Sequence, residues 1–316
     1  MKNSKLVYIV SMGHSGSTLL DLLCSTLPEV FSTGEFVNFP WQLFRGYDKN
    51  DKQTQCSCGQ SFTQCSFWNQ VIQNINNANS IDIVKSPKKH DIAISRPFKY
   101  GKSIIYTIYN RILLFFILNK ILNPFVSIFY KFHLKSIKRN WELFDTISKI
   151  SNTSYVVDSS KDILRFWFLY KYRPNDVKLI ILKRNVHGVA TSSHHGLNDK
   201  LIKIRSNFWY KYYGKIIPKL IFRLPENLFR VITYEEMCER PNMIREKLYR
   251  FISDDNKIIN KITNINPKKT HMVAGNPIRH KDNIIIRYDE RWRQRINDVQ
   301  LELLNKIEEK VNEQYH

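Results

Sequence analysis

The sequence is poor in acidic residues and in cysteine. Its 316 residues include 28 Asp and Glu against 49 Lys and Arg, so the formal net charge is +21. This surplus suits a polyanionic partner, such as a nucleotide, a sulfated or phosphorylated substrate, an anionic lipid or a nucleic acid, without choosing among them. The five cysteines are odd in number, which fits a reducing compartment better than a disulfide framework.

The start of the chain lacks a long hydrophobic run. Residues 1–5 lead into only five apolar residues, too few for a signal peptide or a membrane anchor. We therefore expect a cytoplasmic, bacterial protein. With 43% hydrophobic and 13% aromatic residues the chain is globular, and one α/β domain over 1–316, with a helical insertion at about 81–150, is the economical prediction.

Two nucleotide-binding signatures are also missing near the start, although the pattern there is that of an anion site. The apolar run Leu6–Val10 predicts a strand buried on both faces of a parallel sheet, and Leu19–Leu23 predicts a helix. Ser17 follows Gly16, so the Walker lysine is absent, and no Gly-x-Gly-x-x-Gly occurs. The turn between strand and helix consists of Gly13, His14, Ser15, Gly16, Ser17 and Thr18. Its backbone N–H groups and hydroxyls predict a cradle for phosphate or sulfate.

A second candidate anion site follows another buried strand. Val177–Leu182 predicts that strand, Arg184 stands at its end, and Ser192 follows eight positions later, two turns into an expected helix. An arginine fork and a serine hydroxyl can reach one phosphate from these positions.

Together the two motifs resemble those of the sulfotransferases. Residues 13–20 resemble the loop that binds the 5′-phosphosulfate, usually Pro-[Lys/Arg]-[Ser/Thr]-Gly-[Ser/Thr]-Thr-x-Leu. Arg184 and Ser192 have the Arg-to-Ser spacing of the 3′-phosphate motif, although residues 185–187 replace its Asp-Pro-Arg. The resemblance, which is to the bacterial carbohydrate/tyrosylprotein-type branch, implies an α/β fold with a P-loop-like central parallel sheet flanked by helices.

The activity that the resemblance implies is transfer of a sulfuryl group from 3′-phosphoadenosine 5′-phosphosulfate to an acceptor hydroxyl by in-line displacement. No metal is required, because the sulfate carries less charge than a terminal phosphate. The expected acceptor is a sugar or a glycolipid, with a small-molecule alcohol or phenol as the alternative, and no nucleic-acid partner is expected. The alternatives are a nucleotide kinase-like enzyme, which would need the Walker lysine, and a non-catalytic nucleotide- or nucleic-acid-binding protein, which only the charge favours.

Three residues are candidates for catalysis. In several sulfotransferase branches a glutamate after the first helix is the base for the acceptor hydroxyl, and Glu35 occupies the corresponding position. Tyr155–Asp158 predicts a further buried strand, and Ile163–Tyr172 predicts the helix that follows it. Lys161 lies between them, in a segment that resembles the strand-Asp-Ser-Ser-Lys piece of bacterial sulfotransferases; it is either a solvated helix start or a cation beside the transferred group. His14 stands where relatives have lysine or arginine, and it could itself be the base while Glu35 orients the acceptor.

The resemblance implies further contacts with the nucleotide near the end of the chain. Tyr234 matches a tyrosine that lies near the nucleotide in relatives. Gly275, Asn276 and Arg279 match a Gly-Asn-x-x-Arg loop that closes over the donor, in which Asn276 and Arg279 supply hydrogen-bond donors.

Two segments leave alternatives open. Cys56, Cys58 and Cys65 offer three thiols for a zinc site that Cys24 or His90 could complete, and a disulfide is equally compatible with the sequence. The interpretation that we favour is a buried structural knuckle packed by Trp68. Residues 103–132 are apolar enough for a buried helix that caps the active site. They could instead form an interfacial element whose basic residues, among them Arg111, face lipid headgroups.

Overall fold

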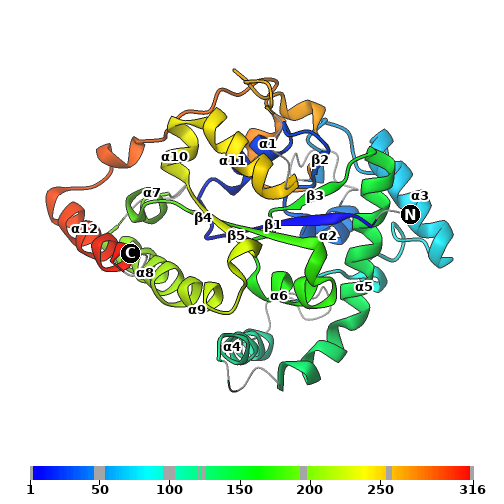
Figure 1. Ribbon diagram of the computed structural model, residues 1–316, viewed down its shortest axis with the longest axis horizontal. Helices are drawn as coiled ribbons and strands as arrows, with labels where there is room; N and C mark the ends of the chain where they lie inside the picture. Colours follow the sequence, from blue (N-terminus) through cyan, green and yellow to red (C-terminus); the bar gives the residue numbers. More distant parts are fainter. Residues whose placement is uncertain are drawn as a thin grey trace.

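The computed structural model describes residues 3–45, 54–94, 104–119, 121, 125–192, 198–253 and 258–313. Within them a parallel sheet has the strand order β2-β3-β1-β4-β5. The strands span Val30–Ser32, Tyr155–Asp158, Lys5–Ser11, Val177–Lys183 and Phe229–Thr233 in that order. The predicted α/β fold with a central parallel sheet flanked by helices is confirmed (Figure 1).

Alternation along the strands explains why both faces of the sheet are covered. Leu6, Tyr8 and Val10 of β1 belong to one buried cluster, whereas Val7 and Ile9 belong to the cluster on the other face. An apolar residue is therefore needed at every position, which is the run that the sequence shows. The sheet is thus buried between two helical layers, and ligands can reach it only at the ends of its strands.

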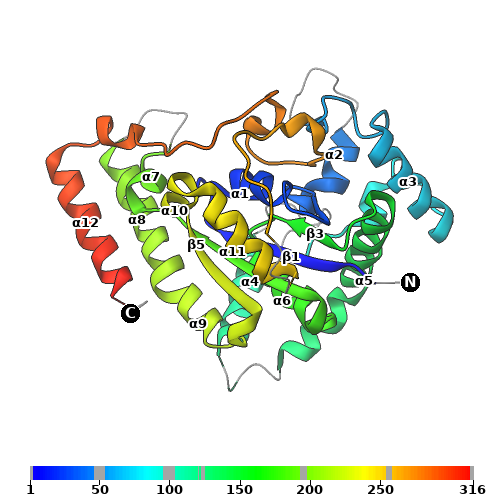
Figure 2. The same ribbon diagram turned by 45° about the horizontal axis from the view of Figure 1, so that its top comes forward.

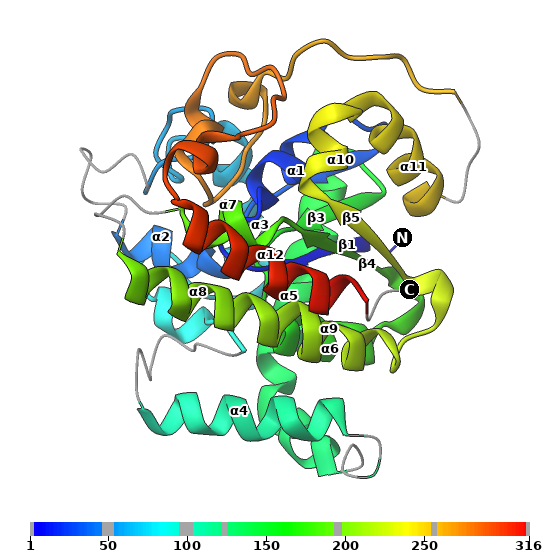
Figure 3. The ribbon, with the colours of Figure 1, turned by 90° about the vertical axis from the view of Figure 1, so that its left-hand side faces the viewer.

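Helices α1, α10 and α11 lie on one face of the sheet, and α5, α6, α8 and α9 lie on the other (Figure 3). The helices span Ser17–Cys24 (α1), Phe39–Arg45 (α2), Ser66–Asn79 (α3), Ile104–Leu118 (α4), Val126–Ser151 (α5), Ile163–Tyr172 (α6), Val186–Ala190 (α7), Asp199–Lys211 (α8), Ile217–Ile221 (α9), Tyr234–Glu239 (α10), Pro241–Ser253 (α11) and Asp298–Asn312 (α12). Helix α6 has the predicted bounds. Helix α7 is shorter than predicted, because it ends at Ala190 instead of continuing through Ser192.

Helix α4 corrects the expectation of a buried helix in residues 103–132. It packs on α5 and α6, outside the layer that covers the sheet (Figures 1 and 3). Leu113 and Ile117 are buried in this contact, but Ile105 is 80% exposed and Phe132, on α5, is 77% exposed. The described part of the segment therefore does not cap the strand ends. Among the described residues, we find no helix whose length and apolarity suffice to cross a bilayer.

The segment after α11 returns across the molecule to the ends of the strands (Figure 2). It contains short 3-10 turns at Pro267–Lys269, Pro277–His280 and Arg291–Gln294 and ends in α12, which packs against α7 and α8. Its residues 271–276 run beside residues 33–35, since the N–H of Val273 donates to the carbonyl of Thr33 and that of Glu35 to the carbonyl of Ala274.

Candidate functional site

The turn between β1 and α1 is a glycine-dependent nest at the end of the central strand. Gly16 is the N-cap of α1 and has φ 87°, in the left-handed region. A Cβ at this position would lie 2.5 Å from Cδ2 of Tyr234, so only glycine fits. No side chain caps α1, which leaves the first N–H groups of the helix available to an anion.

The hydroxyl residues of the nest are buried and held in place. Ser15, Ser17 and Thr18 are each at most 5% exposed, whereas Gly13 and His14 are exposed. The hydroxyl of Tyr213 lies 3.2 Å from that of Ser15, and it donates to the carbonyl of Leu182. Burial raises the pKa of Tyr213 to about 12, so this phenol remains a neutral donor at the base of the loop.

Arg184 lies beside the nest. Its Nη1 donates to the carbonyl of His14 over 3.0 Å, and its guanidinium stands 4.3 Å from the centre of the Tyr234 ring. The side chain is buried, with its Nη2 3.5 Å from the carboxylate of Asp289. Arg291 and Arg184 hold the pKa of that carboxyl at about 2, the hydrogen bond from Arg291 being the larger cause. The sequence predicted Arg184 and Tyr234 separately; the structure brings both to the same loop.

Glycine also makes room for the arginine. Helix α7 begins at the residue after Asn185, whose side chain caps it by accepting from the N–H of Gly188. A Cβ on Gly188 would lie 2.5 Å from Nε of Arg184. The absence of that one carbon therefore sets where the guanidinium lies.

Glu35 and Lys161 form an ion pair near the same end of the sheet. The Nζ–Oε1 distance is 2.5 Å, and both side chains are about one quarter exposed. Lys161 has φ 68°, and its N–H donates to the carbonyl of Ile9 at the end of β1. Lys161 is therefore paired with an acid and is not a solvated residue at a helix start, which was one of the two interpretations from the sequence. The predicted acid and cation are brought together by strands β2 and β3, which run side by side.

Residues 275 and 276 close onto the first turn of α1. The N–H of Asn276 donates to the hydroxyl of Thr18 over 3.0 Å, and a Cβ on Gly275, at φ 133°, would lie 2.9 Å from that oxygen. Asn276 itself is exposed. The loop and the nest, predicted from distant parts of the sequence, are thus in contact.

Arg279 and Ser192 are placed differently from the other predicted residues. Arg279 is buried, and its Nη1 donates to the carbonyls of Gln55 and Met272, so it braces its own segment; burial lowers its pKa to about 10. Ser192 lies past the end of α7, and its carbonyl accepts from Arg205. Contacts of Arg279 and Ser192 with a nucleotide stay predictions. The adjacent histidines 194 and 195 lie outside the described residues.

Sequence reasoning missed two buried acids beneath the site. Asp21 of α1 accepts from the hydroxyls of Ser32 and Ser159, and burial raises its pKa to about 7. Asp158, at the end of β3, forms a fully buried ion pair with Arg165 over 2.8 Å. Asp21 thus ties α1 to the ends of β2 and β3, the strands that precede Glu35 and Lys161, and Asp158 ties β3 to α6. A polar residue inside an otherwise apolar run was the available signal.

The cysteine cluster has its fourth member in a distant segment. The ligand atoms of Cys56, Cys58, Cys65 and His271 all lie within 4.8 Å of one another. Neither of the two residues named from the sequence completes the group: within the described residues it is His271, and not Cys24 or His90.

Comparison with known proteins adds the following. A scan against protein-family models finds no match, and a search of the curated proteins finds none. Among solved structures, the chain is similar to the sulfotransferase domain of the Synechococcus PCC 7002 olefin synthase, with 14% identity and a TM-score of 0.46 over 97% of this chain and 95% of that one. It is also similar to the sulfotransferase domain from the curacin biosynthetic pathway, with 13% identity and a TM-score of 0.39 over 80% of this chain and 75% of that one.

Proposed function

We propose that the protein is a sulfotransferase that moves a sulfuryl group from 3′-phosphoadenosine 5′-phosphosulfate to an acceptor hydroxyl. The observation that carries the proposal is the hydrogen bond from Arg184 to the carbonyl of His14. It joins two anion-binding motifs that are 170 residues apart in the sequence. A nucleotide with one anionic group at its 5′ position and another at its 3′ position needs two such sites side by side.

In this proposal the nest binds the phosphosulfate and Arg184 binds the 3′-phosphate. The acceptor oxygen attacks sulfur in line, and the bond between sulfur and the bridging oxygen of the 5′-phosphate breaks. Glu35 takes the acceptor proton, and adenosine 3′,5′-bisphosphate leaves with the electron pair. Lys161, already 2.5 Å from Glu35, supplies positive charge for the transferred group or the leaving oxygen.

His14 is the alternative base. Its side chain is exposed. Its backbone has φ 65°, and its carbonyl accepts the hydrogen bond from Arg184. In that case Glu35 orients the acceptor. The two assignments differ in which variant abolishes turnover while nucleotide binding is kept.

The deciding experiment combines binding and turnover. We expect calorimetry to detect binding of adenosine 3′,5′-bisphosphate but not of ATP or an oligonucleotide. If ATP binds more tightly than the bisphosphate, the kinase-like alternative is favoured. If the oligonucleotide binds more tightly, the non-catalytic binding protein is favoured. With labelled donor and a panel of sugars, glycolipids and phenols, Glu35→Gln should lower kcat about 10²–10⁴-fold and leave nucleotide affinity unchanged. Glu226→Gln, which alters an exposed carboxylate in a short turn, is the matched control. A full loss with His14→Ala and none with Glu35→Gln would reassign the base.

We propose further that an anionic membrane surface holds the acceptor, and that the apolar face of α4 and α5 rests on it. This face consists of exposed Ile104, Ile105, Ile108, Ile112, Phe115, Phe125, Ile128 and Phe132. The sequence of residues 92–141 contains nine Lys and Arg and no Asp or Glu, so the segment that carries this face has a net positive charge, which suits anionic headgroups.

Cosedimentation tests this contact. The full chain should bind vesicles that contain phosphatidylglycerol, more weakly those of phosphatidylcholine alone, and the double variant Ile105→Ser/Phe132→Ser should bind neither. Ile258→Ser removes a side chain that is 93% exposed and follows α11, the helix on the other face of the sheet (Figure 3), and this variant should bind like the parent. The proposal would be refuted if the protein dimerises through the apolar face of α4 and α5 and does not bind vesicles.

A further inference from the structure

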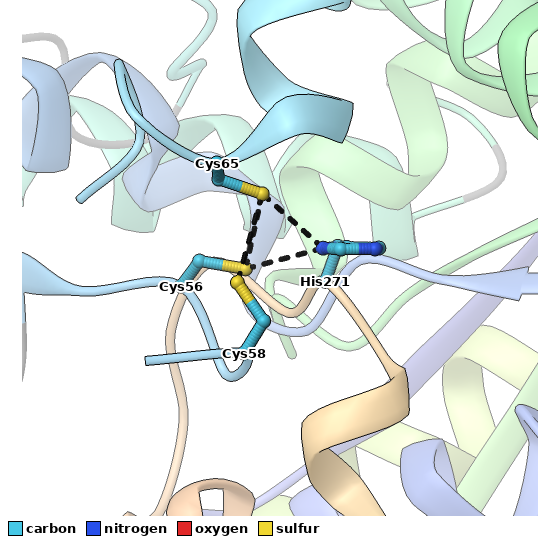
Figure 4. Close-up of side chains that lie close together, drawn as sticks. All are labelled: Cys56, Cys58, Cys65 and His271. Carbon is cyan, nitrogen blue, oxygen red and sulfur yellow. Dashed lines mark hydrogen bonds between the residues drawn. The ribbon is translucent and has the colours of Figure 1, made fainter. Parts of the chain in front are cut away.

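Three cysteines and a histidine from distant segments converge on one point. Cys56 and Cys58 lie in the loop before α3, Cys65 is the N-cap of α3, and His271 comes from the segment that follows α11 (Figure 4). Their Sγ and Nδ1 atoms face a common centre; Cys56 and Cys65 are buried, and Cys58 and His271 are partly buried. We propose that these four residues bind a structural zinc ion.

Four of the six distances between the ligand atoms are close to those of a tetrahedron around zinc, and all six are within 4.8 Å. With Zn–S near 2.3 Å and Zn–N near 2.0–2.1 Å, such a site places two sulfurs about 3.8 Å apart and a sulfur and a nitrogen about 3.5 Å apart. The sulfur of Cys65 lies 3.7 Å from that of Cys58 and 3.8 Å from that of Cys56. Nδ1 of His271 lies 3.5 Å from the sulfur of Cys56 and 3.2 Å from that of Cys65.

The alternatives from the sequence fit less well. A disulfide needs sulfurs about 2.05 Å apart, and all three cysteines are free here. A disulfide would use only two of the three cysteines, so it would not account for the third thiol and the imidazole beside it. In a packed knuckle a thiol can form a hydrogen bond with Nδ1 of His271, but that bond does not account for the convergence of a third sulfur on the same point. Three thiolates and one neutral imidazole form a closed four-ligand set, which is the arrangement of structural zinc sites.

The surroundings hold the ligands in place. Trp68 donates its indole N–H to the carbonyl of His271 over 2.8 Å, and the ring of Phe67 stacks on the imidazole with centroids 5.0 Å apart. Gly59, at φ 90°, makes the turn after Cys58. Zinc with three thiolates has a net charge of −1, since +2 and −3 combine, and the buried cation of Arg279 lies close enough to Cys56 to interact with it electrostatically.

The ion would also position the proposed donor site. His271 begins the segment whose residues 273–276 pair with residues 33–35 and with Thr18. Arg279 ties the same segment to the carbonyl of Gln55, beside the first cysteine. A metal at the cluster therefore fixes one end of the loop that touches the nest, without taking part in the transfer.

Metal analysis of the purified full-length protein tests the proposal. We expect about one zinc per chain in the wild type and about none in Cys65→Ser or His271→Ala. Cys238→Ser changes a cysteine outside the cluster and should keep the zinc. If the variants fail to fold, the wild type decides: cobalt exchanged into it should give the intense visible bands of tetrahedral thiolate coordination, and zinc should remove them.

Several results would overturn the assignment. These are a wild-type chain without zinc that takes up no cobalt after reduction, a disulfide among the three thiols, or stoichiometric iron in place of zinc. Metal content is independent of sulfuryl transfer, so a chain that holds zinc but does not bind the bisphosphate would refute only the proposed function. Removal of zinc by a chelator should lower Tm, and added zinc should restore it.

Discussion

Replacing Gly188 with alanine tests how Arg184 is positioned. Gly188 has no unusual φ and lies in α7, where alanine is favoured over glycine by about 0.5–1 kcal/mol. The new Cβ would lie 2.5 Å from Nε and 2.8 Å from Cζ of Arg184. Because a guanidinium is the far end of a flexible side chain, it will move aside. The fold should therefore survive while the proposed 3′-phosphate site is displaced.

The magnitude follows from the contacts that are lost. A hydrogen bond to a charged group contributes about 1.5–3 kcal/mol, so Arg184→Ala should weaken binding of adenosine 3′,5′-bisphosphate about 10–150-fold. Gly188→Ala displaces the cation without removing it. If half of that free energy is lost, the Kd of this variant for adenosine 3′,5′-bisphosphate should rise about 3–12-fold, with Tm unchanged or slightly raised.

Calorimetry on four proteins decides the matter: the wild type, each single variant and the double variant. In the Arg184→Ala background, Gly188→Ala should have no further effect, because its methyl group acts only through the guanidinium. Wild-type affinity in Gly188→Ala would refute the positioning argument. Equal extra losses in both backgrounds would show that the methyl group acts on something else.

Three further predictions concern stability. Gly16→Ala combines φ 87° with a clash against Tyr234 and should lower the free energy of unfolding by at least about 1–2 kcal/mol in urea titrations; an unchanged midpoint would contradict the nest geometry. Burial raises the pKa of Asp21 to about 7, so the folded state holds this proton more tightly and stability should fall as pH rises from about 4 to 7. Asp21→Asn should flatten this part of the pH dependence, and parallel profiles would count against it. Arg165→Met leaves Asp158 buried without its partner and should cost about 3–5 kcal/mol in the same assay, whereas a loss below about 1 kcal/mol would argue against the pair.

The fold could be predicted where the signal is local. The apolar runs before Gly13 and before Arg184 gave β1 and β4, because a strand buried on both faces needs an apolar residue at each position. The strand Tyr155–Asp158 and the helix Ile163–Tyr172 have the predicted bounds. In each case neighbouring residues alone decide the conformation.

The rest depends on contacts that the sequence does not display. His271 lies 206 residues from Cys65, and only the return of the chain after α11 makes it a ligand. The apolar density of α4 predicted burial, but density does not say whether a second layer exists to cover it. A helix through Ser192 fits the pattern, yet α7 ends at Ala190. Local patterns therefore predicted these elements and named the candidate site residues, but they did not predict the long-range contacts that hold those residues in place.

In the proposed transfer, the ion pair between Lys161 and Glu35 implies an order of addition. Before the donor binds, the ammonium engages the carboxylate and keeps it from an incoming alcohol. An arriving sulfonucleotide competes for the same ammonium and so releases the carboxylate. We therefore expect the donor to bind first and the acceptor second. Other hydroxyl compounds should not engage Glu35 while its carboxylate is paired with Lys161.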